Sequence, residues 1–132
     1  MSIRASLGVL VLLTVASCRV HQIRDPIVVP GTGDLAKNAT AVQQTVEAPT
    51  GRDPKLWWFA ESREQQKWAL KYQRQDHVAM VTVTWDDKDI QIHYRDSAGL
   101  KYDAAKRSIS DTYNSWVQNL AQEIERQVAK LR

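Results

Sequence analysis

The sequence predicts an α+β domain in which a small antiparallel meander sheet of three or four strands is covered on one face by a C-terminal amphipathic helix. Two observations support this class. Every tryptophan and tyrosine of the 132-residue chain lies between residues 57 and 116, which locates the core. Within and after that span, apolar residues recur first at every second position, as in strands, and then at every third or fourth, as in a helix. We therefore expect the α+β domain at residues 55–132.

Residues 1–17 have the three zones of a secretory signal peptide. Arg4 gives a positive charge near the start, residues 7–13 form an apolar run, and small residues follow. The run is too short to span a bilayer, which takes about 20 residues. We predict a lipoprotein signal peptide at residues 1–17, with an ordinary secretory signal and an uncleaved anchor as alternatives.

Cys18 is the chain's single cysteine, and it follows the sequence Leu-Thr-Val-Ala-Ser at residues 13–17. This stretch resembles the lipobox of bacterial lipoproteins, in which a branched aliphatic residue and two small residues precede the cysteine. The resemblance implies that Cys18 carries a covalent lipid and that its new amino group is acylated, which gives stable membrane anchoring. Because residue 19 is Arg and not Asp, the resemblance favours the outer membrane, with the domain facing the periplasm.

The charge and cysteine content bound the class of protein. The chain has 18 basic and 15 acidic residues, and loss of Arg4 with the signal peptide leaves a net charge of +2. A nearly neutral exported domain is not expected to bind nucleic acid. No cysteine follows Cys18, so the stability of the domain has to come from a packed core and not from internal disulfides.

Residues 18–54 differ in composition from the rest of the chain. They contain all four prolines and no tryptophan, which is typical of loops. We predict that the lipidated cysteine is followed by a flexible tether that holds the domain clear of the membrane. Val42 and Val46 lie four residues apart and allow one short helix over residues 38–47.

The clearest strand pair lies at residues 78–85 and 90–94, joined by a turn-like loop at residues 86–89. The first strand is rich in β-branched residues and the second alternates apolar with polar side chains. Antiparallel pairing across this loop places six apolar side chains on one face of the sheet. The expected pairs are Trp85–Ile90, Val83–Ile92 and Val81–Tyr94.

Two more strands are predicted at residues 57–61 and 67–74. In the second, Trp68, Leu70 and Tyr72 alternate with polar residues. The alternative is one helix over residues 61–73, because its Glu, Arg, Gln and Lys residues favour helices. We favour the strands.

An apolar stripe near the end of the chain predicts an amphipathic helix. Such a stripe has to be covered, and the inner face of the sheet is the expected partner. A coiled-coil partner helix is the alternative, although it would show a stricter heptad. The stripe consists of Tyr113, Trp116, Val117, Leu120, Ala121, Ile124, Val128 and Leu131.

The chain resembles a family of small uncharacterised proteobacterial lipoproteins over about residues 57–124. That family shares a strand, then the pattern Y-x-D-S-x-x-L-x-Y, and then a helix containing Y-N-x-W. The resemblance implies a helix–meander–helix layout behind a lipobox, and it implies no reaction. It is carried by residues 77–83, 90–97, 100–102 and 113–117, together with the lipobox.

Two groups of residues are candidate interaction sites. Trp57 and Trp58 could form an exposed aromatic platform for a glycan or peptide, or else a half-buried first strand. A polar and aromatic patch could form where the loop after the last strand meets the final helix; the alternative is that these residues only pin the loop and fill the core. The patch comprises Asp96, Ser97, Tyr102, Tyr113, Asn114 and Trp116.

No metal site and no catalytic residues are predicted. The histidines have no partner at ligand spacing, and the aspartates of the loop at residues 86–89 lack the glycine-bearing loop of a calcium motif. Ser97, His93 and Asp96 are residue types of a catalytic triad, but the sequence has no nucleophile-elbow motif and no phosphate-binding loop.

These observations favour a non-enzymatic, lipid-anchored envelope protein whose small domain contacts another envelope protein. The alternative is a module that binds peptidoglycan, another glycan or a peptide through the aromatic residues near Trp57, and a hydrolase is less favoured. No cofactor is expected apart from the covalent lipid on Cys18. The partner and the oligomeric state are left open.

Overall fold

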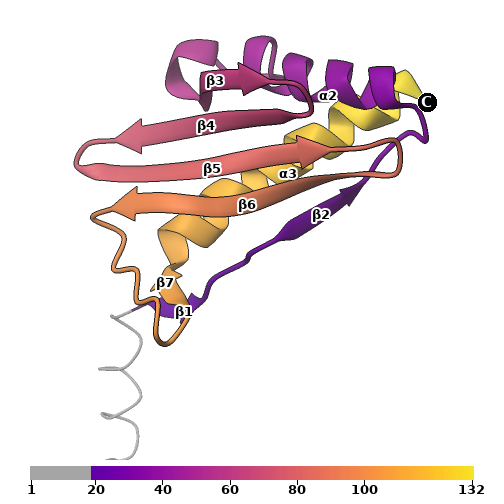
Figure 1. The fold of residues 1–132 in the computed structure, drawn as a ribbon. Helices are drawn as coiled ribbons and strands as arrows, with labels where there is room; N and C mark the ends of the chain where they lie inside the picture. Colours follow the sequence, from indigo (N-terminus) through magenta and orange to yellow (C-terminus); the bar gives the residue numbers. More distant parts are fainter. Residues whose placement is uncertain (1–18) are drawn as a thin grey trace, which may run out of the picture.

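The computed structural model describes residues 19–132, so the predicted signal peptide and Cys18 lie outside the described residues. Strands and helices follow one another along this part of the chain as Figure 1 shows. The elements are β1 (Val20–Gln22), β2 (Ile27–Pro30), α2 (Leu35–Glu47), the short 3-10 helix η1 (Pro54–Leu56), β3 (Phe59–Glu64), β4 (Lys67–Arg74), β5 (His77–Trp85), β6 (Asp89–Ala98), β7 (Ser108–Ser110) and α3 (Asp111–Leu131).

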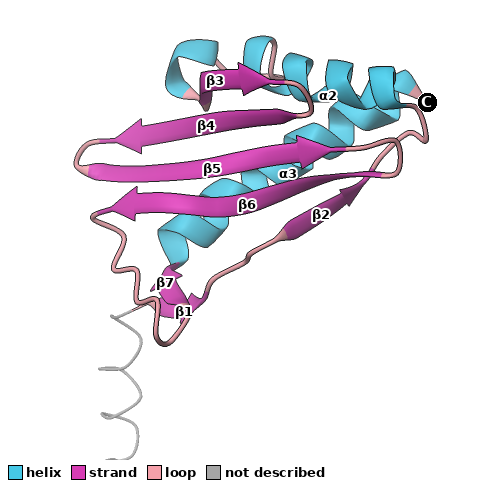
Figure 2. Ribbon diagram, in the orientation of Figure 1, coloured by secondary structure: helices cyan, strands magenta, loops and turns pink. Residues whose placement is uncertain are grey.

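The main sheet has five antiparallel strands in the order β2-β6-β5-β4-β3, and β1 pairs with β7 in a separate two-stranded sheet. Both helices lie on the same face of the main sheet (Figure 2). The predicted α+β class, with a meander sheet and a C-terminal helix packed on it, is confirmed; the sheet has one strand more than the three or four predicted, because β2 is added beside β6. Neither helix of the described residues is both long enough and apolar enough to cross a membrane.

The predicted hairpin has the expected register. Trp85 pairs with Ile90, Val83 with Ile92 and Val81 with Tyr94. β4 has the predicted bounds, so the alternative helix over residues 61–73 is wrong. The strand predicted at residues 57–61 is instead β3, which begins at Phe59 and ends at Glu64, so that Trp57 and Trp58 precede it. Strict alternation of apolar and polar side chains fixes the register because a slip of one residue would turn every apolar side chain outward.

The core lies between the inner face of the main sheet and the two helices. Alternate residues of β5 are buried, and the apolar stripe of α3 covers them as predicted. The largest fully buried apolar side chains are Trp58, Tyr113, Leu70, Ile90, Ile92, Leu100, Ile109, Leu120, Ile124, Val29 and Val42.

Residues 19–54 are not a flexible tether, which corrects the prediction. β2 pairs with β6, α2 packs against α3, and the side chains of Ile23, Val29 and Val42 are buried in the same core. The prolines of this segment lie at the ends of its elements and do not mark a flexible linker. Pro30, for example, is the last residue of the edge strand β2, a position that tolerates a missing N–H. The predicted boundary at residue 55 therefore cuts through one core, although the predicted short helix does exist.

A buried asparagine connects α2 to the main sheet. The Asn38 side chain is fully buried; its Oδ1 accepts a hydrogen bond from the backbone N–H of Thr32 at 2.8 Å, and its Nδ2 donates to the carbonyl of Asp86 at 2.8 Å. Gly31 passes so close that an added Cβ would lie 2.5 Å from Asn38 Nδ2. Residue 31 therefore has to be glycine if Asn38 is to link the start of α2 to the β5–β6 turn.

Two neighbouring valines of β2 test whether this segment belongs to the core. Val29 is 2% exposed and Val28 is 50% exposed. We expect Val29→Ala to lower the free energy of unfolding by about 2 kcal/mol, because it removes two buried methyl groups and leaves a cavity. Val28→Ala should change it by less than about 0.5 kcal/mol. Urea unfolding followed by circular dichroism measures both, and equal small effects would restore the tether interpretation.

Candidate functional site

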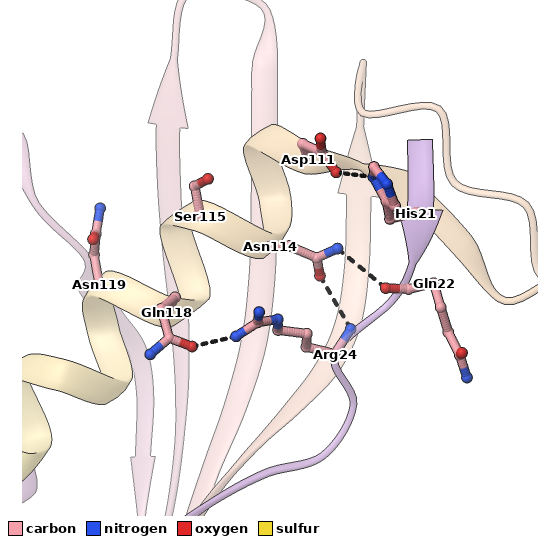
Figure 3. Close-up of a pocket in the computed structure, with 8 residues that line it drawn as sticks. All are labelled: His21, Gln22, Arg24, Asp111, Asn114, Ser115, Gln118 and Asn119. Atoms are coloured by element: carbon pink, nitrogen blue, oxygen red, sulfur yellow. Dashed lines mark hydrogen bonds and ion pairs between the residues drawn. The ribbon is translucent and has the colours of Figure 1, made fainter. Parts of the chain in front are cut away.

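An open polar groove of about 570 Å³ lies between the segment at residues 21–24 and the first turns of α3 (Figure 3). The α3 residues that line it recur three or four positions apart, so they share one face of the helix. That face points away from the main sheet, which leaves it available to the N-terminal segment. The lining residues are His21, Gln22, Arg24, Asp111, Asn114, Ser115, Gln118 and Asn119.

Hydrogen bonds across the groove fix the N-terminal segment to α3. Asn114 acts as a clamp: its Oδ1 accepts from the backbone N–H of Arg24 at 3.1 Å, and its Nδ2 donates to the carbonyl of Gln22 at 3.1 Å. The Arg24 guanidinium donates to the side-chain oxygen of Gln118, and the His21 imidazole contacts the Asp111 carboxylate (Figure 3). The groove therefore has fixed walls.

The groove offers both donors and acceptors, with charges of both signs. Within residues 19–132, the side chains of Ser115 and Asn119 make no hydrogen bond, so these groups are available to a ligand. Carboxamides and hydroxyls donate and accept at the same time, as the main chain of a peptide also does. No hydrogen bond joins Ser115 to His21, so the arrangement lacks the nucleophile–base contact of a catalytic triad.

The predicted polar and aromatic patch is divided by the structure. Asn114 lines the groove, whereas Trp116 packs edge-on against Tyr72, with ring centroids 4.7 Å apart. Asp96 and Ser97 lie within β6, which continues to Ala98, and not in the loop predicted after residue 94; the Asp96 carboxylate accepts a hydrogen bond from the backbone N–H of Ser97. These residues therefore do not form one surface, and the structural alternative describes most of them.

Three tyrosines form a stack beneath the loop that follows β6. The ring of Tyr94 lies 4.4 Å from that of Tyr102 and 5.5 Å from that of Tyr113, between centroids. Burial, with a smaller contribution from the Asp25 carboxylate, raises the pKa of Tyr113 well above its ordinary value. Burial likewise raises the pKa of Tyr94. Burial thus disfavours the ionised form of both phenols, as expected of rings that pack in a core.

Trp57 and Trp58 do not form an exposed platform. Their side chains are only 5% and 1% exposed. The Trp57 indole N–H donates to the carbonyl of Thr45 at 2.8 Å, and the Trp58 ring packs 5.5 Å from that of Tyr72. The buried rings count against a glycan-binding or peptide-binding surface at this place.

The candidate triad residues lie on opposite faces of the main sheet. Ser97 pairs with the buried Ala79, and its hydroxyl lies 2.9 Å from that of Tyr94 on the inner face. His93 lies on the outer face, where its Nε2 is 3.2 Å from the Thr84 hydroxyl. A bulge at Arg95 separates them, because one extra residue reverses the alternation of β6. No group of three or more possible metal ligands occurs among residues 19–132 either.

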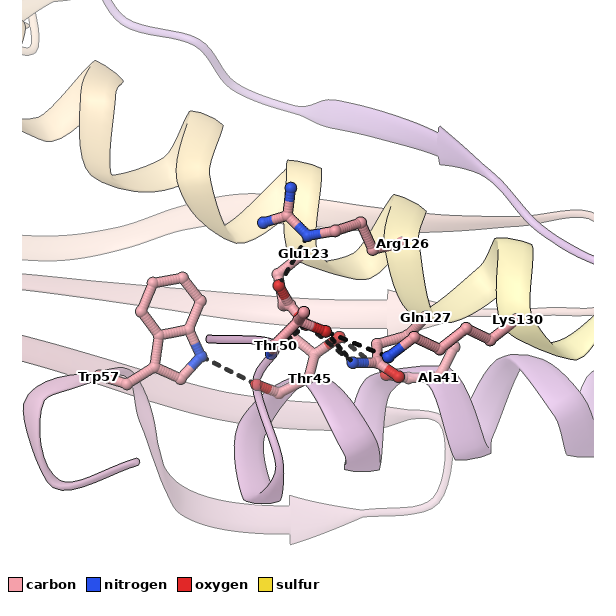
Figure 4. A network of polar contacts seen from close by, with 8 residues as sticks. All are labelled: Ala41, Thr45, Thr50, Trp57, Glu123, Arg126, Gln127 and Lys130. Carbon is pink, nitrogen blue, oxygen red and sulfur yellow. Dashed lines mark hydrogen bonds and ion pairs between the residues drawn. The ribbon is translucent and has the colours of Figure 1, made fainter. Parts of the chain in front are cut away.

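A buried carboxylate connects α3 to the loop between α2 and β3 (Figure 4). The Glu123 side chain is fully buried; it accepts hydrogen bonds from the backbone N–H of Thr50 at 2.8 Å, from Gln127 at 2.7 Å and from Arg126 at 3.0 Å. Burial alone would favour the neutral acid, but these donors outweigh it and hold the pKa of Glu123 below its ordinary value. Because its partners are all within the protein, Glu123 holds the fold together.

A second, more apolar groove of about 470 Å³ lies between the start of α2 and the β3–β4 turn. The Trp68 and Trp85 rings meet there edge-on, with centroids 6.2 Å apart, and the Arg63 guanidinium lies 4.4 Å from the centre of the Trp68 ring. Gln43, Gln65 and Gln66 complete its lining, together with Leu35, Ala36, Ala39 and Glu64.

The sequence analysis missed the N-terminal half of the polar groove. The polar stripe on α3 was a visible signal, but His21 and Arg24 were assigned to the tether, and nothing local connects them to residues about ninety positions later. Comparisons with protein-family models, with curated proteins and with solved structures found no match. The resemblance to small proteobacterial lipoproteins and the lipidation of Cys18 therefore stay predictions.

Proposed function

We propose that the protein is a non-enzymatic, lipid-anchored protein of the bacterial cell envelope that contacts another envelope protein through the polar groove between β1 and α3. One observation carries this proposal: the groove is built on the segment that directly follows the predicted lipidation site. Cys18 immediately precedes Arg19, whose carbonyl accepts a hydrogen bond from the backbone N–H of Asp111 at the start of α3. A partner in the groove would therefore be held at the membrane.

The chemistry of the groove supports a polypeptide partner. Its charges are balanced, with the Arg24 guanidinium and the Asp111 carboxylate on its walls, and the carboxamide of Asn119 can pair with exposed peptide groups. The lipobox and Arg19 favour anchoring in the outer membrane, with the domain on the periplasmic side.

A glycan-binding or peptide-binding module is the alternative function. It cannot use Trp57, and the observation that favours it is now the second groove, where the partly exposed ring of Trp68 lies beside carboxamides; Trp85 is only 7% exposed and supports that ring from below the surface. Such a combination suits the apolar and polar faces of a sugar.

The anchor and the groove can be tested in one set of experiments on the full chain in its native cells. We expect Cys18→Ala to abolish incorporation of palmitate and to move the protein from the membrane fraction to the soluble one. A photo-reactive amino acid at Asn119 in the groove should give one dominant crosslinked protein in the Cys18 background and lose it in the Cys18→Ala background.

The matched control places the same crosslinker at Gln73, an exposed residue of β4 outside the polar groove. Identical adducts from Gln73 and Asn119 would exclude the groove as the contact. Palmitate-free wild-type protein would exclude the lipid anchor. A crosslinker at Gln65 that captures cell-wall fragments, with none captured at Asn119, would instead establish the alternative function.

A further inference from the structure

The loop at residues 99–107 is fixed beside β1, at the end of the molecule where the chain enters the fold (Figure 1). The backbone N–H of Ile23 donates to the carbonyl of Arg107 at 2.9 Å, and the backbone N–H of Ser110 donates to the carbonyl of Leu100 at 2.8 Å. Asp103 and Ser108 exchange two backbone hydrogen bonds that close the loop. Backbone hydrogen bonds therefore hold the loop and residues 20–23 together as one surface.

This end of the domain has no tether to separate it from an anchor at Cys18. Adjacent Cα atoms are about 3.8 Å apart, and Arg19 is already hydrogen-bonded to the start of α3. The headgroup layer of a bilayer is about 5–8 Å thick on each side. A lipid on Cys18 would therefore bring the loop at residues 99–107 into contact with that layer.

The side chains of the loop suit a phospholipid surface. Lys101, Lys106 and Arg107 are exposed, and within residues 19–132 none of them is in an ion pair. Tyr102 is 38% exposed, and tyrosine is a residue that settles at the headgroup level of membranes.

The acids at this end are already engaged within the protein. The Asp103 carboxylate accepts from the backbone N–H of Lys106 at 3.2 Å, that of Asp25 accepts from the backbone N–H of Tyr94 at 3.1 Å, and that of Asp111 contacts His21. They therefore do not neutralise the lysines of the loop by direct ion pairing.

Two of the three cations occupy strained backbone positions. Lys101 has φ of 58° and Arg107 has φ of 50°, in the left-handed region where glycine carries no penalty. The same backbone region is occupied by Gln66 and Gln75 in the β3–β4 and β4–β5 turns, so these angles describe tight turns that hold the loop in place.

We propose that the loop at residues 99–107 is a membrane-facing surface that binds the phosphates of anionic phospholipids such as phosphatidylglycerol through Lys101, Lys106 and Arg107, with Tyr102 at the headgroup level. The inference rests on the proposed lipid anchor for its biological setting. It fixes the orientation of the domain, with β1, β7 and the polar groove toward the membrane and the end of α3 away from it.

The test uses the full chain carrying Cys18→Ser, so that no lipid anchor contributes to binding. Co-sedimentation is measured with vesicles of phosphatidylcholine alone and with vesicles in which a third of the lipid is phosphatidylglycerol. We expect the triple variant Lys101→Gln, Lys106→Gln, Arg107→Gln to bind the anionic vesicles on the order of 10- to 100-fold more weakly than the parent, because each cation near an anionic surface contributes to binding. Any contribution of residues 1–17 is common to both proteins and cancels.

The matched control removes the same charge elsewhere, with Lys67→Gln, Lys71→Gln and Arg74→Gln on β4. It should retain most of the parent's affinity, and an equal loss in both triple variants would overturn the proposal. Hydrogen exchange of the parent chain gives a second measurement that needs no variant: amides of residues 99–107 should become protected on anionic vesicles, and the β4–β5 turn should not. Unchanged exchange in the loop would also overturn it. Neither measurement requires lipidation. A wild-type protein without palmitate would therefore contradict the lipid anchor alone, and it would leave the result for the loop unchanged.

Discussion

Replacing Trp58 with alanine is expected to lower the free energy of unfolding by about 3–5 kcal/mol, the range found for large aromatic side chains removed from cores. The Trp58 ring is 1% exposed and packs 5.5 Å from Tyr72, whose other neighbour is Trp116 of α3. The tryptophan thus joins the chain before β3 to β4 and, through Tyr72, to the last helix. Its loss would remove much of the roughly 5–15 kcal/mol that stabilises a typical domain.

The next residue provides the control. Phe59 is 49% exposed, so Phe59→Ala removes apolar surface that is already half in water. We expect its effect on the free energy of unfolding to be below about 1 kcal/mol. Urea unfolding followed by far-ultraviolet circular dichroism measures both variants without relying on tryptophan fluorescence. A smaller loss for Trp58→Ala than for Phe59→Ala would contradict the burial described here and restore the exposed platform.

Replacing Glu123 with alanine is expected to lower the free energy of unfolding by about 3 kcal/mol. The substitution leaves the buried side-chain amide of Gln127 without this acceptor, which costs about 1–3 kcal/mol, and it also removes the hydrogen bond that holds the Thr50 backbone N–H. Glu125→Ala removes an exposed carboxylate two positions along the same helix and should cost less than about 0.5 kcal/mol. Equal losses would show that the Glu123 network contributes nothing specific.

The same carboxylate gives the protein a pH dependence of known sign. The pKa of Glu123 is lower in the folded protein than its ordinary value of 4.5, so the charged form stabilises the fold at pH values above that value. The stabilisation is lost as the pH falls through the folded pKa. In urea titrations at about pH 7 and about pH 3, we expect Glu123→Gln to lose less stability on acidification than the wild type. An identical loss would assign the acid sensitivity to other groups.

The fold class and the central hairpin could be predicted because apolar and polar side chains alternate along short stretches of the sequence. Buried and exposed positions alternate along β5 and β6, and one register alone places Trp85 opposite Ile90 with all apolar partners on one face. β2 gave no such signal, since it is a four-residue edge strand that ends in a proline. Its partner β6 lies in the other half of the chain, and only the tertiary fold identifies it.

The polar groove was only half predictable for the same reason. Asn114 was recognised as a residue that holds something in place, but its partners Gln22 and Arg24 are about ninety positions away. The bulge at Arg95 was also beyond local reasoning. It leaves the composition of β6 unchanged and yet moves Ser97 to the face opposite His93, which separates residues that simple alternation would have placed together.

The pairing of the first elements with the last has a consequence for how the chain folds as it is synthesised. β1 pairs with β7, β2 pairs with β6, and α2 packs chiefly against α3. The residues that leave the ribosome first therefore find their partners only when nearly all of the chain has emerged, because contacts this distant in sequence form late. An unfinished chain with this topology cannot close its core prematurely. For the exported lipoprotein that we propose, that delay would keep the chain in a form that a translocation channel can accept.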